Sequence, residues 1–151
     1  VEELDTDIVV NIQGDEPAME PQLIDDLVGI FDTPNVFMAT PATSDISVED
    51  ELNPNVVKVL VDQNNIAMAF RREPRQYEMS GYYRHIGMYA FRKKALMKFT
   101  NMTQSENEKK YKLEQLRILD NGLPIHVLMT DYSGRGIDTE EDLKTFMETH
   151  G

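Results

Sequence analysis

Two segments of the chain carry carboxylates in places where a divalent metal ion could bind. The first is Gln13-Gly-Asp-Glu-Pro17, which closes the apolar run of residues 7–13. Ligands of α/β proteins bind at the carboxyl ends of strands, and Mg²⁺ prefers carboxylates together with substrate phosphates. Asp15 and Glu16 are therefore candidate metal ligands, and Gly14 would let a substrate approach the backbone. A polar strand-to-helix turn is the alternative interpretation.

The second segment is Gly134-Arg-Gly-Ile-Asp-Thr139, at another expected strand-to-helix junction. Asp138 directly precedes a capping box formed by Thr139 and Asp142, so its carboxylate could simply complement the helix dipole. It is also a candidate metal ligand. Asp15 and Asp138 would come from separate strand ends, and together they could flank one metal ion.

Two further segments carry polar side chains that could contact a substrate. In Tyr83-Arg-His-Ile-Gly-Met-Tyr89, a strand would place His85 and Tyr89 on one face and Arg84 on the other. A lone histidine in a strand is more commonly structural. In Leu113-Glu-Gln-Leu-Arg117, Glu114 and Gln115 would by default form the solvated face of a helix. None of these segments defines a function by itself.

The composition limits the possible functions. A chain of 151 residues with 40% hydrophobic and 28% charged residues has the size and content of a single globular domain. It contains 15 Lys and Arg against 27 Asp and Glu, a net charge of −12, which argues against a nucleic-acid partner. The absence of cysteine excludes disulfides and thiolate chemistry. No apolar run approaches the roughly 20 residues of a membrane span, and without a signal peptide we expect a cytoplasmic protein.

The elements that would position these residues follow from hydrophobic patterning. Residues 7–13 are typical of a strand buried on both faces in a parallel sheet, and with a helix at 21–31 and a strand at 36–42 they predict a βαβ crossover. An antiparallel hairpin is expected from residues 56–61 and 66–70. The remaining expectations are a loop at 71–81, a strand at 82–91, a helix at 93–99, a polar loop at 100–110, a helix around 113–119, a strand at 124–130 and a final helix from Thr139.

The motifs gain meaning as an ordered set. Val-Asn-Ile-Gln-Gly-Asp-Glu-Pro is followed by Asn53-Pro-Asn-Val-Val-Lys-Val, Arg84-His-Ile-Gly-Met-Tyr-Ala-Phe, Leu113-Glu-Gln-Leu-Arg and Gly136-Ile-Asp-Thr-Glu-Glu-Asp-Leu143. This succession resembles the CMP-KDO synthetases (3-deoxy-manno-octulosonate cytidylyltransferases), relatives of the CMP-sialic acid synthetases. The resemblance runs from about residue 5 to residue 143, in the family's order and at about its spacing.

The resemblance implies a fold and an activity. The fold is α/β, a three-layer nucleotide-diphospho-sugar-transferase-like (Rossmann-like) mixed sheet with an antiparallel insertion used for dimerisation, so a homodimer is implied. The family transfers CMP from CTP to 3-deoxy-manno-octulosonate (KDO) with Mg²⁺ and releases pyrophosphate, for lipopolysaccharide or capsule biosynthesis. The chain shows no counterpart of the family's amino-terminal segment, which carries the loop that grips the CTP phosphates, and we expect a single, partial cytidylyltransferase domain over residues 1–151.

The resemblance also implies roles for individual residues. Asp15 and Asp138 match the metal-binding, catalytic aspartates, and Gln13 matches a residue that lines the active site. The residues that match acid-sugar contacts are Arg72, His85, Tyr89, Glu114 and Gln115. The chain departs from the family next to Arg72, because Arg71 stands where a serine is usual and Glu73 replaces an isoleucine before the proline.

Two alternatives remain open from the sequence. The acceptor could be another acid sugar, such as an amino-KDO or a sialic acid, and residues 71–81 are where that difference would lie. The chain could instead be a non-catalytic assembly module, in which the hairpin and the strand at 82–91 build a subunit interface.

Overall fold

The chain forms one seven-stranded sheet with helices on its two faces, as seen in a computed structural model that describes residues 5–13, 19–73, 81–134, 137, 140, 143–144 and 147–148. The strands are β1 (Ile8–Ile12), β2 (Met38–Thr43), β3 (Lys58–Val61), β4 (Ala67–Arg71), β5 (Tyr82–His85), β6 (Met88–Arg92) and β7 (Ile125–Thr130). The helices are α1 (Pro21–Gly29), continued by the 3₁₀-helix η1 (Ile30–Asp32), α2 (Val48–Leu52), α3 (Lys93–Thr100), α4 (Glu106–Tyr111) and α5 (Leu116–Asp120).

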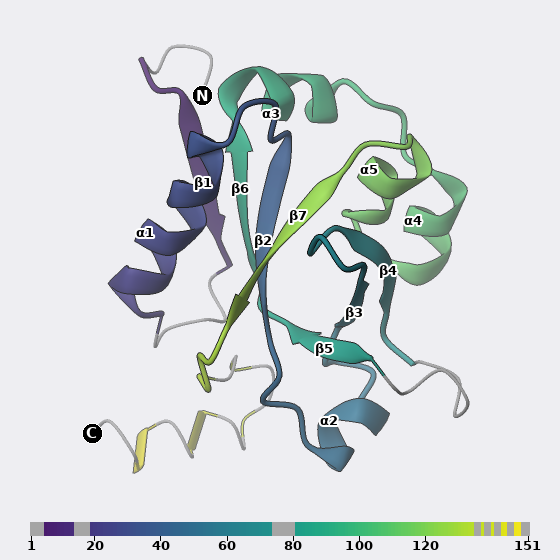
Figure 1. The fold of residues 1–151 in the computed structure, drawn as a ribbon. Helices are drawn as coiled ribbons and strands as arrows, with labels where there is room; N and C mark the ends of the chain where they lie inside the picture. Colours follow the sequence, from purple (N-terminus) through teal and green to yellow (C-terminus); the bar gives the residue numbers. More distant parts are fainter. Residues whose placement is uncertain are drawn as a thin grey trace.

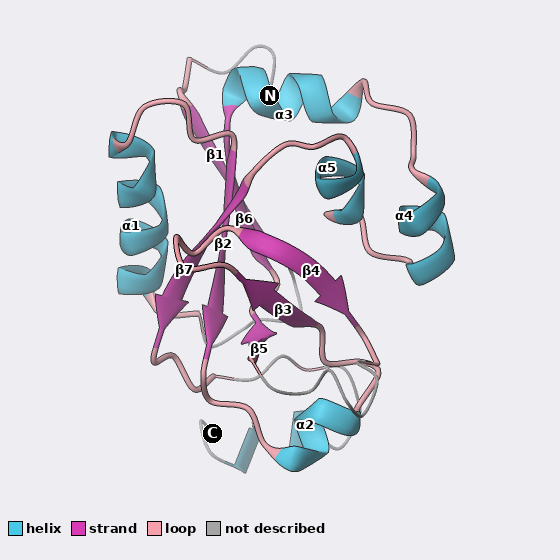
Figure 2. Cartoon of the chain, turned by 45° about the vertical axis from the view of Figure 1, so that its right-hand side comes forward, coloured by secondary structure: helices cyan, strands magenta, loops and turns pink. Residues whose placement is uncertain are grey.

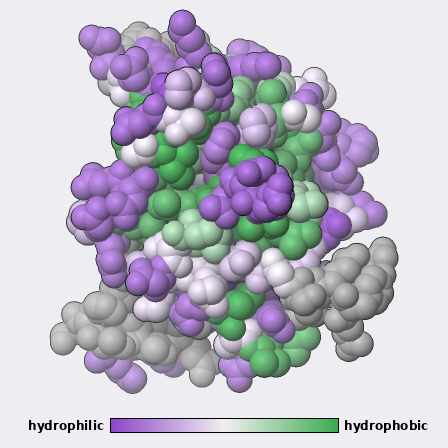
Figure 3. Space-filling view, in the orientation of Figure 1, coloured by the Kyte–Doolittle hydropathy of each residue, from purple (hydrophilic) through white to green (hydrophobic). Residues whose placement is uncertain are grey.

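The fold has three layers, with the sheet in the middle and helices on each side. In Figure 2 the sheet stands between α1 on one side and α4 and α5 on the other. Each side has its own apolar core: Leu27 of α1 packs with Ala39 and Met88, whereas Ile118 of α5 packs in the cluster that contains Phe70. Figure 3, in the orientation of Figure 1, shows hydrophobic residues reaching the surface between hydrophilic ones. The predicted three-layer α/β class is confirmed.

The strands β1, β2 and β7 run in the same direction and end at the same edge of the sheet. β7 pairs with β2 in parallel, from Met38↔Ile125 to Thr43↔Thr130. β6 is antiparallel to both β1 and β2, so β1 has the direction of β2 and β7. The carboxyl ends of all three therefore lie at the lower end of the sheet in Figure 1.

The first strand forms as predicted, but the prediction of its neighbours and of its burial was wrong. β1 was expected to be buried on both faces within a parallel sheet, but it pairs antiparallel with β6, which lies between β1 and β2. Within the part of the chain that the structure describes, β1 has no partner on its other edge. Its side chains accordingly range from half-buried to exposed, and Ile12 retains 41% of its accessible surface.

The long strand predicted at 82–91 is divided into β5 and β6 by a break at Ile86 and Gly87. Before the break the amide of His85 donates to the carbonyl of Val57, and after it the amide of Gln13 donates to the carbonyl of Gly87. The break thus marks the place where one edge of the strand changes partner from β3 to β1. The predicted hairpin is present as β3 and β4, and together with β5 it forms the antiparallel insertion.

The prediction of a polar loop over residues 100–110 was also wrong, because this stretch contains α4. Its first turn is closed by a capping box, in which Ser105 Oγ accepts from the amide of Glu108 and the Glu108 carboxylate accepts from the amide of Ser105. This Ser-x-x-Glu pattern is readable from the sequence, whereas the helix has too few apolar residues for periodicity to reveal it.

The final helix was predicted to begin at Thr139, and this position lies outside the described residues. No helix in the described part of the chain combines the length and the apolar character that crossing a bilayer requires.

Candidate active site

The break between β5 and β6 brings two of the predicted substrate-binding residues together. His85 is the last residue of β5 and retains only 9% of its accessible surface. Its ring lies 5.4 Å from the ring of Tyr89 and meets the ring of Phe70 edge-on at 5.3 Å, measured between centroids. The placement of His85 and Tyr89 on one face, expected from strand geometry, is thus what the structure has.

The hydrogen bonds of His85 define which ring nitrogen carries the proton. Its Nε2 lies 2.8 Å from the hydroxyl of Thr40, and that hydroxyl donates its single proton to the carbonyl of Met88 at 2.7 Å. Nε2 must therefore donate to Thr40, which leaves Nδ1 as an unprotonated acceptor. Burial lowers the pKa of His85 to about 3, so the imidazole is neutral at physiological pH.

Gln13 reaches the same break from the end of β1. A Cβ added at Gly87 would lie only 2.6 Å from Oε1 of Gln13, so the Gln13 side chain lies against the backbone of this glycine. Any larger residue at position 87 would push it away. The glycine between His85 and Tyr89 therefore allows Gln13 to share their site.

Asn11 is a neighbour of this group that the sequence analysis did not single out. It lies directly opposite Tyr89 in the register of β1 and β6, so the two side chains share one face of the sheet. Asn11 is exposed. The sequence pattern that could have pointed to Asn11 is its alternation with Ile12 and Gln13, which places both amides on the face opposite the isoleucine.

A second group of predicted residues lies around the start of α5. Arg72, just after β4, donates from one terminal nitrogen to the carbonyl of Pro54 at 3.1 Å and from the other to the carbonyl of Lys112 at 3.3 Å. Lys112 ends α4 in the left-handed conformation, with φ of 53°. The guanidinium of Arg72 thus ties the insertion to the turn that leads to Glu114 and Gln115.

Glu114 and Gln115 differ from each other in burial. Glu114 is exposed, as expected for a solvated face, but Gln115 retains only 4% of its accessible surface. Gln115 is the N-cap of α5, before the regular helix begins, and its side chain is not on the outer face. Among the residues that the structure describes, its buried Nε2 has no hydrogen-bond partner. Such a group is costly to leave unsatisfied in a folded protein and suits a ligand's acceptor.

The two groups are connected through β4. α5 contacts β4, and Phe70 of β4 packs against His85. Gln13, His85 and Tyr89 therefore form one group at the strand break, whereas Arg72, Glu114 and Gln115 form the other beside it.

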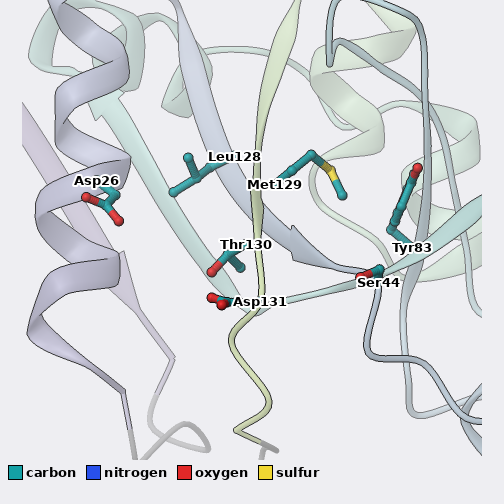
Figure 4. Close-up of a pocket in the computed structure, with 7 residues that line it drawn as sticks. All are labelled: Asp26, Ser44, Tyr83, Leu128, Met129, Thr130 and Asp131. Atoms are coloured by element: carbon teal, nitrogen blue, oxygen red, sulfur yellow. The ribbon is translucent and has the colours of Figure 1, made fainter.

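A hollow of about 650 Å³ lies at the carboxyl ends of β2 and β7 (Figure 4). Leu128 and Met129 extend to opposite sides of β7, and Asp131 follows the strand's last residue. The lining residues are Asp26, Ser44, Tyr83, Leu128, Met129, Thr130 and Asp131. The hollow thus marks the strand ends, but none of the predicted acid-sugar contacts lines it.

The predicted metal ligands cannot be placed in the same way. Asp15, Glu16 and Asp138 lie outside the described residues. Across the residues that the structure does describe, no group of three or more His, Asp or Glu side chains could hold a metal ion. The strands that lead toward Asp15 and Asp138, β1 and β7, nevertheless end at the same edge of the sheet (Figure 1).

Comparison with known proteins decides the family. The family model described as cytidylyltransferase matches residues 1–128. The chain belongs to the cytidylyltransferase family. Two relatives named 3-deoxy-manno-octulosonate cytidylyltransferase are 41% identical over 93% of the chain, in Chloroherpeton thalassium, and 38% identical over 96%, in Geotalea uraniireducens. The chain spans 60% and 64% of their lengths.

Solved structures agree with this assignment. A structure described as CMP:2-keto-3-deoxy-manno-octonic acid synthetase complexed with CTP is 32% identical, with a TM-score of 0.87, and the match covers 98% of this chain and 63% of that one. The inositol-1-phosphate CTP transferase of T. maritima has 18% identity and a TM-score of 0.58 over 97% of this chain and 56% of its own, which shows the shared fold alone. The resemblance inferred from the motifs is confirmed.

Proposed function

We propose that the chain is the acceptor-binding part of a CMP-KDO synthetase, which transfers CMP from CTP to KDO and releases pyrophosphate. The observation that carries this proposal is the meeting of Gln13, His85 and Tyr89 at the break between β5 and β6. These residues match acid-sugar or active-site positions in the family, and they converge here from β1, β5 and β6. The reaction would serve lipopolysaccharide or capsule biosynthesis in the cytoplasm.

The side chains of the site suit a polyhydroxylated acid. The neutral His85 presents an unprotonated Nδ1, which can accept a hydrogen bond from a sugar hydroxyl. Gln115 offers a buried Nε2 that has no acceptor within the described ranges of the chain, and it can donate to a hydroxyl or carboxylate oxygen. A site with fixed polar partners discriminates against ligands that lack the matching groups.

The metal site of the proposal consists of Asp15 and Asp138. Two carboxylates are the donor type that Mg²⁺ takes when the substrate's phosphates complete its coordination. The bound ion would neutralise phosphate charge and polarise the α-phosphate of CTP. The chain's own contribution is then to orient the acceptor hydroxyl, because positioning supplies a large share of catalysis in phosphoryl transfer.

We further propose that the enzyme is a homodimer that uses the β3–β4 hairpin. β4 pairs with β3 on one edge, and in the described part of the chain it has no strand partner on the other. Met68 of this strand retains 61% of its accessible surface. An open edge with an exposed apolar side chain favours association.

The experiment measures pyrophosphate release by this chain from CTP and Mg²⁺, with KDO, a sialic acid or no acceptor. Calorimetry of KDO binding to the same chain accompanies it. Release that depends on KDO and disappears in Asp15→Asn, whose folding is checked by circular dichroism, supports the proposal. KDO binding without release supports the acceptor-binding role. A folded chain that binds neither KDO nor CTP contradicts the proposal, and preference for sialic acid assigns the other acceptor.

A further inference from the structure

Lys58, on β3, is a buried cation to which neither the motifs nor the proposed reaction assigns a role. Its side chain has no accessible surface, although lysine is almost never fully buried unless it is paired. Nζ donates to two main-chain carbonyls, those of Asn53 at 2.6 Å and Arg72 at 2.7 Å. Lys58 therefore connects the turn before β3 with the end of β4.

The surroundings of Lys58 keep its ammonium in place. Asp50, Glu51 and Glu73 favour the charged form, whereas burial is the larger effect and lowers the pKa to about 8. Arg84 lies directly opposite on β5 and donates from Nε to the carbonyl of Asp45. The ammonium is thus held by two carbonyls and by the nearby carboxylates.

Arg72 also contacts the turn between α4 and α5. Lys58 binds the carbonyl of Arg72, and the guanidinium of Arg72 bridges the carbonyls of Pro54 and Lys112. Lys112 lies three residues before Gln115, whose buried Nε2 has no hydrogen-bond partner among the described residues. A continuous chain of hydrogen bonds therefore runs from Lys58 through Arg72 to the turn that precedes Gln115.

We propose that Lys58 is a positioning residue, which fixes the main chain of Arg72 so that the guanidinium holds the turn before α5 and sets the position of Gln115. Lys58 itself does not touch the acceptor. The consequence for acceptor affinity rests on the proposed function, but the mechanical link between Lys58 and the turn does not. The two parts are therefore tested separately.

The link is tested by ¹H–¹⁵N NMR of the chain without ligand. Lys58→Met keeps the length of the side chain and removes both donors, so the resonances of Arg72, Lys112 and the Gln115 side-chain amide should shift or broaden. Lys58→Arg restores a donor and should return them toward the wild-type positions. Lys94→Met, at an exposed lysine of α3, is the matched control and should leave them in place. Unchanged resonances in Lys58→Met overturn the proposal.

A second variant covers the case in which Lys58→Met does not fold. Arg72→Met removes the next member of the chain of hydrogen bonds at a half-buried position and leaves Lys58 intact. It should move the Lys112 and Gln115 resonances as well. If it does not, Arg72 does not hold the turn, and the proposal is wrong.

Calorimetry tests the consequence for binding. Lys58→Met should weaken KDO binding roughly tenfold, the size that a change acting on a site through connected residues can have, with CTP affinity unchanged. Lys58→Arg should recover most of the loss. Equal weakening of KDO and CTP, or no weakening of KDO, contradicts the positioning role. If the wild-type chain binds no KDO, the acceptor assignment fails, whereas the NMR result still decides the link.

Discussion

Glu108 and Gln115 are both polar, lie on neighbouring short helices, and are almost equally buried, with 3% and 4% of their accessible surface left. Glu108 has every partner it needs. Its carboxylate accepts from two nitrogens of Arg117, from Gln104 and from the amide of Ser105. Gln115 buries an Nε2 for which the described part of the chain supplies no hydrogen-bond partner.

The difference separates a structural cluster from the proposed binding site. The hydrogen bonds from Arg117 are the main cause that lowers the pKa of Glu108, and Arg117 also lies over the ring of Phe99 at 4.5 Å. All these groups satisfy one another, so a ligand has nothing to add. A buried donor left unsatisfied at equal depth costs stability, and the acceptor proposed above would supply the missing hydrogen-bond partner.

The largest effect is expected where the satisfied cluster is broken. Arg117→Met leaves the Glu108 carboxylate buried without its cation, which should lower the free energy of unfolding by about 3–5 kcal/mol. Urea unfolding followed by circular dichroism measures it. The matched control is Lys109→Met, which removes an exposed ion pair with Glu106 and should cost no more than about 0.5 kcal/mol. Similar losses in both variants would show that the Glu108 cluster has no special role.

The buried imidazole of the candidate site should make stability depend on pH. The pKa of His85 is about 3 in the folded chain and 6.5 as its ordinary value, so the unfolded chain binds the proton first as the pH falls. The free energy of unfolding should therefore decrease by about 2 kcal/mol between pH 6.5 and pH 5. The pKa of Glu108 is lowered from 4.5, so the stability that its ionised carboxylate contributes is lost only at lower pH.

His85→Gln isolates this contribution, because glutamine can still donate to Thr40 but does not titrate. The variant's stability curve should be flatter than the wild type's between pH 6.5 and pH 5. Parallel curves would mean that His85 is not held neutral by the fold. An NMR titration of the His85 ring, expected to show no protonation at pH 5, checks the same point directly.

Much of the fold was predictable because it depends on local patterns. Apolar runs and turn residues located the β3–β4 hairpin, α1 and β7 to within a few residues. The pairing of β1 was not predictable, since an apolar run does not show whether its neighbour is parallel or antiparallel. α4 was missed because its stability comes from a capping box and from the contact between Glu108 and Arg117, which joins two separate helices.

The roles of the predicted site residues stay predictions, and their arrangement in space could not be read from the sequence. The motifs singled out His85, Tyr89 and Gln115, whereas the break at Gly87 and the burial of Gln115 depend on how distant strands meet. Arg72 was predicted beside the sugar, and in the structure its guanidinium bridges two main-chain carbonyls. Sequence gives such a residue its charge but not its partners.

For Gln115 we expect a change in the free energy of unfolding that is opposite in sign to the change expected for Arg117→Met. Gln115→Met removes a buried donor that has no partner and keeps the volume, so it should raise the free energy of unfolding by about 1 kcal/mol. The same change should abolish measurable KDO binding in calorimetry. Gln104→Met is the comparison, because its amide donates to Glu108 and its loss should destabilise the chain. A destabilised Gln115→Met would mean that the amide has a structural partner.

The smallest change in stability, and a separate test of the site, is expected for Gly87→Ala. The atoms nearest to the added Cβ belong to the exposed Gln13 side chain, which can move, so the free energy of unfolding should change by less than about 1 kcal/mol. Gly29→Ala, at a helical glycine with nothing within 4 Å, is the control that leaves the site untouched. Gly87→Ala should weaken KDO binding only while Gln13 is present. In a double-mutant cycle its effect should therefore vanish in the Gln13→Ala background, and additive effects would show that Gly87 does not act by making room for Gln13.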